Sequence, residues 1–453
     1  MIQSDLKRTA VLRGALGHEE SRPDLHSLGA RRESDSTTRS IFKKLPSTSS
    51  MRKQIPILRG LAILAVVMSH CAAWGHHVMF YWAHRYRQVE SPNFDQFGSF
   101  SYYVLLAING LPMFAVPAFL FISGYYIAYA IGGRPITAGS RVVWARIKVL
   151  LWPYLIWSFA IFLGDFLQGQ TYPIPEYARR LIRGHAVGAY FFIPVLIQFY
   201  ILSPLIVRYA ESKPRLLLLV SAIVQGAMYY LCGSRFGRFF RPLDAASLAL
   251  YFPLGTVCFL HHRRASEWLA RFKSSMLLAT VVLSALMVFE KSVRLESLML
   301  AGVERQSDEL SPYFYSLTFI LFFVAADSSR LPFARTLRWL GTRSYGIYLL
   351  HFSVLVLVAR VTAKYAPRLL AHQILFQPLL LLTGLGLPLL FMACVARSPI
   401  RELYRYLFGV ALQLPLRRKT SPEEPREVPV SEKSSDADLQ HWHAPTSGVR
   451  GGN

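Results

Sequence analysis

Ten apolar stretches, each about as long as a bilayer is thick, determine what this chain can fold into. They lie at 55–74, 101–131, 149–168, 188–207, 215–231, 245–260, 275–290, 311–327, 343–360 and 374–396. A helix needs about 20 apolar residues to cross the hydrocarbon core, so the boundaries of the shorter stretches are soft. Because lipid offers the backbone no hydrogen bonds, a crossing segment in such a chain must be helical. The sequence therefore predicts an all-α polytopic integral membrane protein with about ten transmembrane helices.

The basic charge of the chain follows this division into spans. Of the 453 residues, 17% are charged, against about 25% in soluble domains, yet the formal net charge is +24. If the N-terminus is cytoplasmic, the inner segments hold 34 of the 50 Lys and Arg residues and the outer loops hold 13. Lys and Arg gather on the cytoplasmic side of membrane proteins. We therefore expect both termini in the cytoplasm and a lipid bilayer, not nucleic acid, as the partner of these charges.

Two polar ends flank the membrane domain. Residues 1–50 are basic and Ser-rich, without the apolar core of a signal peptide, so we expect a disordered tail. Met51 directly precedes the first span and is an alternative start. Residues 51–410 form the predicted ten-helix domain, and residues 411–453 a second disordered tail.

No metal site is predicted. The four cysteines, Cys71, Cys232, Cys258 and Cys394, have neither disulfide nor metal-ligand spacing. The external loop at 75–100 carries three histidines (His76, His77 and His84) that match no metal signature. Aromatic residues in and beside that loop (Trp74, Tyr81, Trp82 and Tyr86) are typical of an interfacial belt, and a sugar-stacking surface is the alternative.

Arg59 and His70 lie inside the first apolar stretch. Ionisable groups in hydrocarbon are costly, and they usually face a bundle interior or a watery cavity. Eleven residues make about three helical turns, so both side chains leave the helix on nearly the same face, about 16 Å apart. Arg59 can bind an anion through its guanidinium, and His70 can act as a general base. A histidine that ties helices together is the alternative for His70.

Further polar residues extend this pattern. Arg134, Arg141, Arg146 and Lys148 follow the second span and can gather with Arg59 at the inner mouth, or they can serve only as stop-transfer charges. His351 has either a functional role or a helix-to-helix hydrogen bond. Asp165 either snorkels to the outer interface or orients His70.

Five motifs, in order, resemble the membrane-bound acyltransferase-3 family, whose ten-helix members O-acylate bacterial glycans, antibiotics and other hydroxylated acceptors. They are Leu58-Arg59-Gly60-Leu61-Ala62 followed by His70, an aromatic run ending in Ser123-Gly124, a basic helix entry at 146–154, a block at 192–200 followed by Pro204, and a late-helix signature at 340–351. Pro56, Val149 and Ala189 depart from the family pattern, and the last predicts an acceptor pocket unlike the commonest one.

The resemblance implies an O-acyltransferase of the bacterial inner membrane. It implies that an acyl group moves from cytosolic acyl-CoA to a hydroxyl of a saccharide or saccharide-containing acceptor. The simplest such group is acetyl, with acetyl-CoA as the donor. His70 is then the base, and Arg59, Arg141, Arg146 and Lys148 hold the CoA phosphates. Six residues are expected along the substrate path: Ser123, Gln198, Tyr200, Tyr345, His351 and Asp165. For Ser123 and Tyr345, helix packing is the alternative.

Two other classes of function fit parts of the pattern. A transporter or flippase for a glycan or lipid-linked sugar explains the spans and buried polar residues, but explains less well the cations at one mouth. A membrane sensor or scaffold does not need charges in hydrocarbon. The acyltransferase interpretation accounts for both features.

Overall fold

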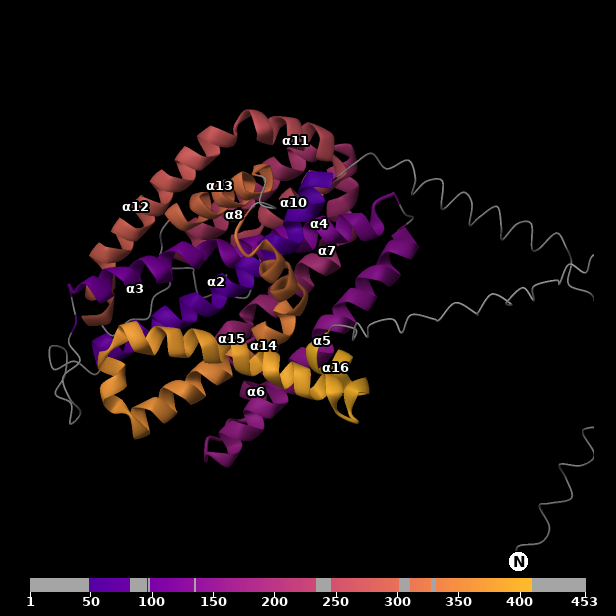
Figure 1. Ribbon diagram of the computed structural model, residues 1–453. Helices are drawn as coiled ribbons and strands as arrows, with labels where there is room; N and C mark the ends of the chain where they lie inside the picture. Colours follow the sequence, from indigo (N-terminus) through magenta and orange to yellow (C-terminus); the bar gives the residue numbers. More distant parts are fainter. Residues whose placement is uncertain are drawn as a thin grey trace, which may run out of the picture. The chain divides into compact units, whose positions relative to one another are not determined.

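The computed structural model describes residues 49–81, 96, 98–133, 136–233, 246–300, 310–326 and 331–409. All regular elements in these ranges are helical (Figure 1). The α-helices are α2 (Ser49–Tyr81), α3 (Phe100–Gly110), α4 (Ala115–Ile131), α5 (Ile136–Leu167), α6 (Ile174–Arg183), α7 (Phe192–Ser212), α8 (Pro214–Gly233), α10 (Tyr251–Leu260), α11 (His262–Arg271), α12 (Lys273–Leu300), α13 (Ser311–Ala325), α14 (Ala334–Tyr365), α15 (Gln373–Arg397) and α16 (Tyr404–Phe408). Short 3-10 helices are η1 (Leu111–Phe114), η2 (Gly188–Phe191), η5 (Pro367–Ala371) and η6 (Arg401–Leu403).

This architecture confirms the predicted fold class. Within the described ranges, eight helical segments are long and apolar enough to cross a membrane. The apolar helices α10 and α13 are shorter and coincide with the predicted sixth and eighth spans. The number ten and the cytoplasmic termini therefore stay predictions. Helix α2 begins at Ser49, inside the predicted tail, while the rest of both tails, together with Trp82, His84 and Tyr86, lies outside the described residues.

Four segments form the interior of the bundle. At least half of the membrane-length window is buried in α2, in α3–α4, in α7 and in α14. The corresponding windows of α5, α8, α12 and α15 are only 17 to 28% buried. Lipid tails are as apolar as the core, so helices at the edge can expose leucine and phenylalanine without penalty. The four interior segments are therefore the ones that can best shield a polar side chain from lipid.

The first and ninth predicted spans, α2 and α14, pack in parallel at very short range. A methyl group at Gly60 would lie 1.8 Å from the carbonyl oxygen of Leu337, and one at Gly341 would lie 2.6 Å from that of Pro56. Small residues permit such close backbone approach between membrane helices. Gly60 and Gly341 thus determine the register in which the first turns of α2 pack against the first turns of α14.

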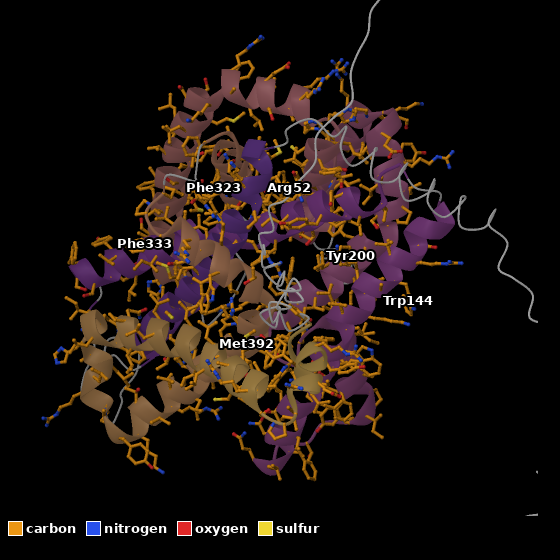
Figure 2. The ribbon with its side chains drawn as sticks, turned by 45° about the vertical axis from the view of Figure 1, so that its right-hand side comes forward. Arg52, Trp144, Tyr200, Phe323, Phe333 and Met392 are labelled. Carbon is orange, nitrogen blue, oxygen red and sulfur yellow. The ribbon has the colours of Figure 1, made fainter. Side chains whose placement is uncertain are left out.

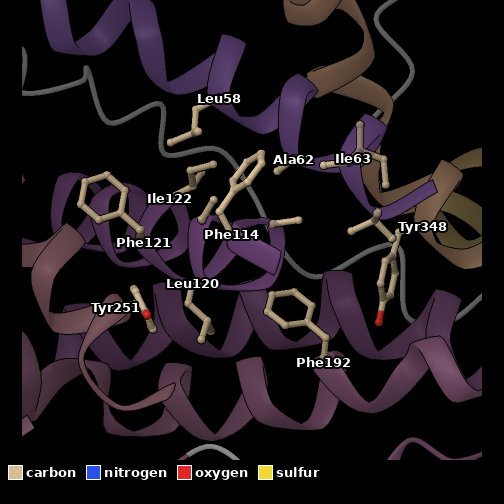
Figure 3. Packing of buried hydrophobic residues seen from close by; sticks show 14 of the residues in the cluster. Leu58, Ala62, Ile63, Phe114, Leu120, Phe121, Ile122, Phe192, Tyr251 and Tyr348 are labelled. Carbon is tan, nitrogen blue, oxygen red and sulfur yellow. The ribbon is translucent and has the colours of Figure 1, made fainter. Parts of the chain in front are cut away.

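A second glycine pair joins α4 to α10. A methyl group at Gly124 would lie 2.0 Å from the carbonyl oxygen of Phe252, and one at Gly255 would lie 1.9 Å from that of Phe121. Large side chains, including Phe121 and Tyr251, fill the space around this crossing (Figure 3). The contact explains locally why the second span carries Ser123-Gly124, because a larger residue at 124 would separate the two helices.

The second predicted span contains a 3-10 turn. Pro112 has no N–H to donate to the preceding turn, and the helix tightens over Leu111–Phe114 before it continues as α4. Neighbouring helices donate hydrogen bonds to two backbone carbonyls at this turn. The Tyr315 hydroxyl of α13 donates to the oxygen of Leu111 at 2.9 Å, and the Lys291 ammonium of α12 donates to that of Asn109 at 3.4 Å.

Candidate active site

The contact between α2 and α14 holds the arginine predicted to bind an anion. The Arg59 Nε donates a hydrogen bond to the Ser344 Oγ at 2.8 Å. The terminal nitrogens of Arg59 make no hydrogen bond to the residues that the structure describes, and the side chain is partly exposed. A guanidinium has five N–H groups in a fork. Ser344 uses one of them and fixes its direction, so four stay available to a ligand.

A second cation and two tyrosines surround this guanidinium. Arg146 of α5, Tyr126 of α4 and Tyr200 of α7 all lie within electrostatic range of Arg59. The Ser123 side chain of α4 lies close to that of Tyr200. In the described part of the chain, the ion pairs join Glu176 to Arg179 and Arg180, so no carboxylate there pairs with Arg59 or Arg146. Two neighbouring guanidinium groups without a carboxylate make a site for an anion.

The structure does not bring Arg141 and Lys148 to this cluster by any contact among the described residues. Lys148 is exposed, and its ammonium lies 5.7 Å from the ring centre of Trp144, one helical turn away on α5. Figure 2 labels Trp144 on this helix. Positions 146 and 148 point about 200° apart on a helix, whereas 141 and 148 share a face. Arg146, although exposed, therefore lies on the side of α5 that acts on Arg59, and the other two cations lie on the opposite side.

His70 lies against a second histidine further along the same pair of helices. The ring centres of His70 and His351 are 5.3 Å apart, with planes tilted by 44°. Phe352 packs edge-on against His70 with ring centres 5.2 Å apart. The Nδ1 of His351 lies 2.8 Å from the carbonyl oxygen of Tyr348 and 3.1 Å from that of Ile347. His70 and His351 thus form one layer of the site, the histidine layer. Arg59 and its neighbours Ser344 and Arg146 form another, the arginine layer, nearer the start of α2 and α14.

A polar group from the second span supports the backbone next to His70. The Asn109 side-chain amide donates to the carbonyl oxygen of Ser69 at 3.4 Å. Its side-chain oxygen accepts a hydrogen bond from Lys291. Asn109 lies in the last turn of α3, directly before the 3-10 turn. The turn in the second span therefore lies beside the histidine layer and is held there by side chains of α12 and α13.

The remaining predicted site residues have different positions. The Tyr345 hydroxyl donates to the carbonyl oxygen of Leu150 at 2.6 Å. Its proton is therefore used in a hydrogen bond that joins α14 to α5. Gln198 lies on α7 and is partly exposed. Asp165 lies near the C-terminal end of α5 and is partly exposed; none of the described contacts joins it to His70.

Ser344 was not among the site residues that the sequence predicted, although it stands in the late-helix motif. A signal for it exists in the spacing. Ser344 and His351 are seven residues apart, two helical turns, and so share one face of α14. This face repeats the pattern of Arg59 and His70 on α2. Two helices that each carry two polar residues at whole-turn spacing can be expected to meet along those faces.

The site thus offers a guanidinium, that of Arg59, which can bind an anion through two N–H groups. The imidazole of His70 lies about three turns further along the same helix. No group of three or more His, Cys, Asp or Glu residues that could hold a metal lies in the ranges that the structure describes. The groups that this site can offer to a reaction are guanidinium groups at one level of the α2–α14 pair and imidazoles at another.

Comparison with known proteins identifies the family. Residues 52–396, which are most of the chain, match a family that is defined by an acyltransferase domain. The chain belongs to the membrane-bound acyltransferase-3 family. A protein named as a membrane-bound acyltransferase, YfiQ of Bacillus subtilis strain 168, is 24% identical over 285 residues, which cover 59% of this chain and 75% of YfiQ. No solved structure gives a significant match. Membership of the acyltransferase-3 family confirms the resemblance and makes this protein a membrane acyltransferase.

Proposed function

We propose that this acyltransferase moves an acyl group, most simply acetyl, from cytosolic acyl-CoA to a hydroxyl of a saccharide or saccharide-containing acceptor in a bacterial cytoplasmic membrane. The observation that carries the proposal is the shared position of Arg59 and His70 along α2, both turned toward α14. One end of this face binds an anion, and the other end can remove a proton.

The arginine layer supports a phosphate-bearing donor. Arg59 keeps its terminal nitrogens free of hydrogen bonds to the described residues, and Arg146 adds a second positive charge. Guanidinium groups bind phosphate oxygens in pairs, and such charge-assisted bonds are roughly twice as strong as neutral ones. Since Arg59 lies near the start of α2, and that end is expected in the cytoplasm, the donor enters from the compartment in which acyl-CoA is made.

The separation of the two layers fits the length of this donor. Arg59 and His70 are eleven positions apart, which advances a helix by about 16 Å. The chain from the 4′-phosphate of CoA to the thioester carbonyl carbon has about 14 bonds, and it reaches about 16 Å at the ~3.5 Å per three bonds of an extended chain. An acyl-CoA whose phosphate binds Arg59 can therefore present its thioester at His70.

The chemistry at the histidine layer is acyl transfer to oxygen. His70 takes the proton of an acceptor hydroxyl, and the oxygen attacks the thioester carbonyl carbon. The new C–O bond forms as the C–S bond breaks, and the departing thiolate takes the proton back from His70. His70 ends the cycle neutral, and no external oxidant, reductant or metal is needed. A covalent acyl-His70 intermediate uses the same residues in two steps.

The far end of α2 supports a hydroxylated acceptor. The rings of Trp74 and His77 lie 5.3 Å apart in an edge-on arrangement. Gln377 donates to Gln373 at 2.9 Å, and both amides lie directly against Gly75. Aromatic faces and amides are the groups on which a sugar can stack and to which its hydroxyls can bond. They lie one to two turns beyond His70, on the side away from the donor.

Two variants and one control test this function. The assay measures release of free CoA from acetyl-CoA, with de-O-acylated envelope glycan of the source organism as acceptor. His70→Ala should abolish turnover but keep acetyl-CoA-dependent thermal stabilisation, which binding to the folded state produces. Arg59→Ala should raise the KM for acetyl-CoA about 10- to 100-fold, the loss of a charge-assisted bond worth about 1.5–3 kcal/mol. Arg338→Ala, at an exposed position of α14, should change neither.

The outcomes separate the classes of function. Full turnover in folded His70→Ala removes the base assignment. Absence of any stabilisation by acetyl-CoA, with export of the glycan lost in the deletion strain, instead identifies a transporter.

A further inference from the structure

The buried side chain of His351 has one nitrogen bonded and one without a partner. Its Nδ1 faces two carbonyl oxygens, which can only accept, so Nδ1 carries the proton. In the neutral ring, Nε2 then carries a lone pair. The side chain is fully buried, and Nε2 has no hydrogen-bond partner in the described structure. A buried acceptor left unpaired in a native protein calls for an explanation.

The neighbour that can supply a proton to this nitrogen is His70. Two imidazoles joined by an N–H···N bond of about 2.9 Å have ring centres roughly 5 Å apart. The observed separation is 5.3 Å, and the 44° tilt of the planes leaves the rings neither stacked nor perpendicular. Phe352 closes the other side of His70, and Tyr348 packs beside His351 with ring centres 5.9 Å apart. No hydrogen bond joins the two rings as they stand, so such a bond requires a rotation of the His70 ring that turns one of its nitrogens toward Nε2 of His351.

We propose that His351 is a positioning residue for His70, which rests on His70 being the base of the proposed function. The Nε2 of His351 accepts the N–H of His70 and so selects the tautomer in which the other nitrogen of His70 holds the lone pair. That lone pair takes the proton of the acceptor hydroxyl. In the imidazolium that forms, the N–H toward His351 keeps its hydrogen bond, and the proton returns to the leaving thiolate from the opposite nitrogen. His351 itself stays neutral throughout.

This arrangement also gives a role to the hydrogen bond between His351 and the backbone of its own helix, α14. The bond from Nδ1 to the preceding turn of α14 holds the His351 ring and presents Nε2 toward α2. A base oriented by a third group is the common arrangement of catalytic histidines, in which the orienting acceptor sets the tautomer. Here a neutral imidazole takes the place that a carboxylate has elsewhere, which avoids placing another charge between the helices.

Two substitutions separate positioning from structure. His351→Asn keeps an amide near the position of Nδ1 and removes the acceptor at Nε2. His351→Gln places an amide oxygen near Nε2. With acetyl-CoA and de-O-acylated envelope glycan, the Asn variant should lose at least 30-fold in kcat with a KM for acetyl-CoA within twofold of wild type. The Gln variant should recover at least a tenth of the wild-type kcat. His261→Asn, which removes another histidine held to a backbone carbonyl, is the matched control and should leave kcat unchanged.

The result that overturns the proposal is equally specific. Wild-type kcat in His351→Asn, or equal losses in the Asn and Gln variants with unchanged melting temperatures, shows that no acceptor at Nε2 is needed. If His351→Asn does not purify as a monodisperse protein, His351→Met takes its place, since a thioether is only a weak acceptor. An inactive His70→Ala together with a fully active His351→Asn retains the proposed function and removes this inference alone.

Discussion

Replacing Gly60 by alanine tests the close contact on which both layers of the site depend. The new methyl carbon would lie 1.8 Å from the carbonyl oxygen of Leu337, whereas ordinary contact begins at 3.4 Å. Backbone cannot rotate away as a side chain can, so α2 and α14 must part by about 1.6 Å, the difference between those distances. The hydrogen bond from Arg59 to Ser344, at 2.8 Å, then exceeds bonding distance.

The expected magnitudes follow from this displacement. Overpacking costs about 1–3 kcal/mol, and the better helix propensity of alanine returns up to about 1 kcal/mol. We expect Gly60→Ala to be destabilised by about 1–2 kcal/mol in detergent. Misplacement of reacting groups by 1 Å can cost about 100-fold in rate, so kcat should fall by about that factor. Thermal unfolding and turnover of acetyl-CoA with the glycan acceptor measure the two effects.

Gly386→Ala on α15 is the matched control. No atom lies within 4 Å of a methyl group at that position, so alanine there should stabilise the helix by up to about 1 kcal/mol and leave turnover unchanged. A Gly60→Ala protein as stable and as active as the Gly386→Ala protein would refute the reasoning, because α2 and α14 could not then be in backbone contact.

Three further outcomes are expected. Tyr345→Phe should lose about 1 kcal/mol of stability, measured by thermal unfolding, with kcat within threefold of wild type, since its hydroxyl bonds a backbone carbonyl. Gly124→Ala should lower the melting temperature more than a surface substitution does, because its methyl group would lie 2.0 Å from the Phe252 oxygen. Tyr315→Phe should cost about 1 kcal/mol in the same measurement by removing the hydrogen bond to the Leu111 oxygen, and a wild-type melting temperature would contradict that role.

The sequence was sufficient to predict the class of fold and the shared direction of Arg59 and His70. Both follow from length, hydropathy and helical geometry, which depend on one segment at a time. The partner of that face was harder to predict. Lipid and protein are equally apolar around a membrane helix, so hydropathy does not show which helix lies beside which. Gly60 and Gly341 lie at the close contact, but the presence of a glycine in a sequence does not show which other helix packs against it.

Helical spacing could have refined the prediction for the inner cations. Arg146 and Lys148 are two residues apart, and a helix turns them to nearly opposite sides. The structure accordingly places Arg146 near Arg59 and Lys148 over Trp144. The 3-10 turn at Pro112 is a different case. A proline in a span indicates a disturbed helix, but the groups that bond the backbone carbonyls around it, Tyr315 and Lys291, lie about 200 and 180 residues further along the chain.

The parallel pairing of α2 and α14 has a consequence for how the protein is made. Arg59 and Ser344 are 285 residues apart. At about 5–20 residues per second, a ribosome needs roughly 15 to 60 s after inserting the first span before it supplies the serine that receives the arginine. Until then the guanidinium must reach toward the headgroups at the near end of its helix. A chain interrupted before α14 lacks both Ser344 and His351, so neither Arg59 nor His70 can meet its partner on the other helix.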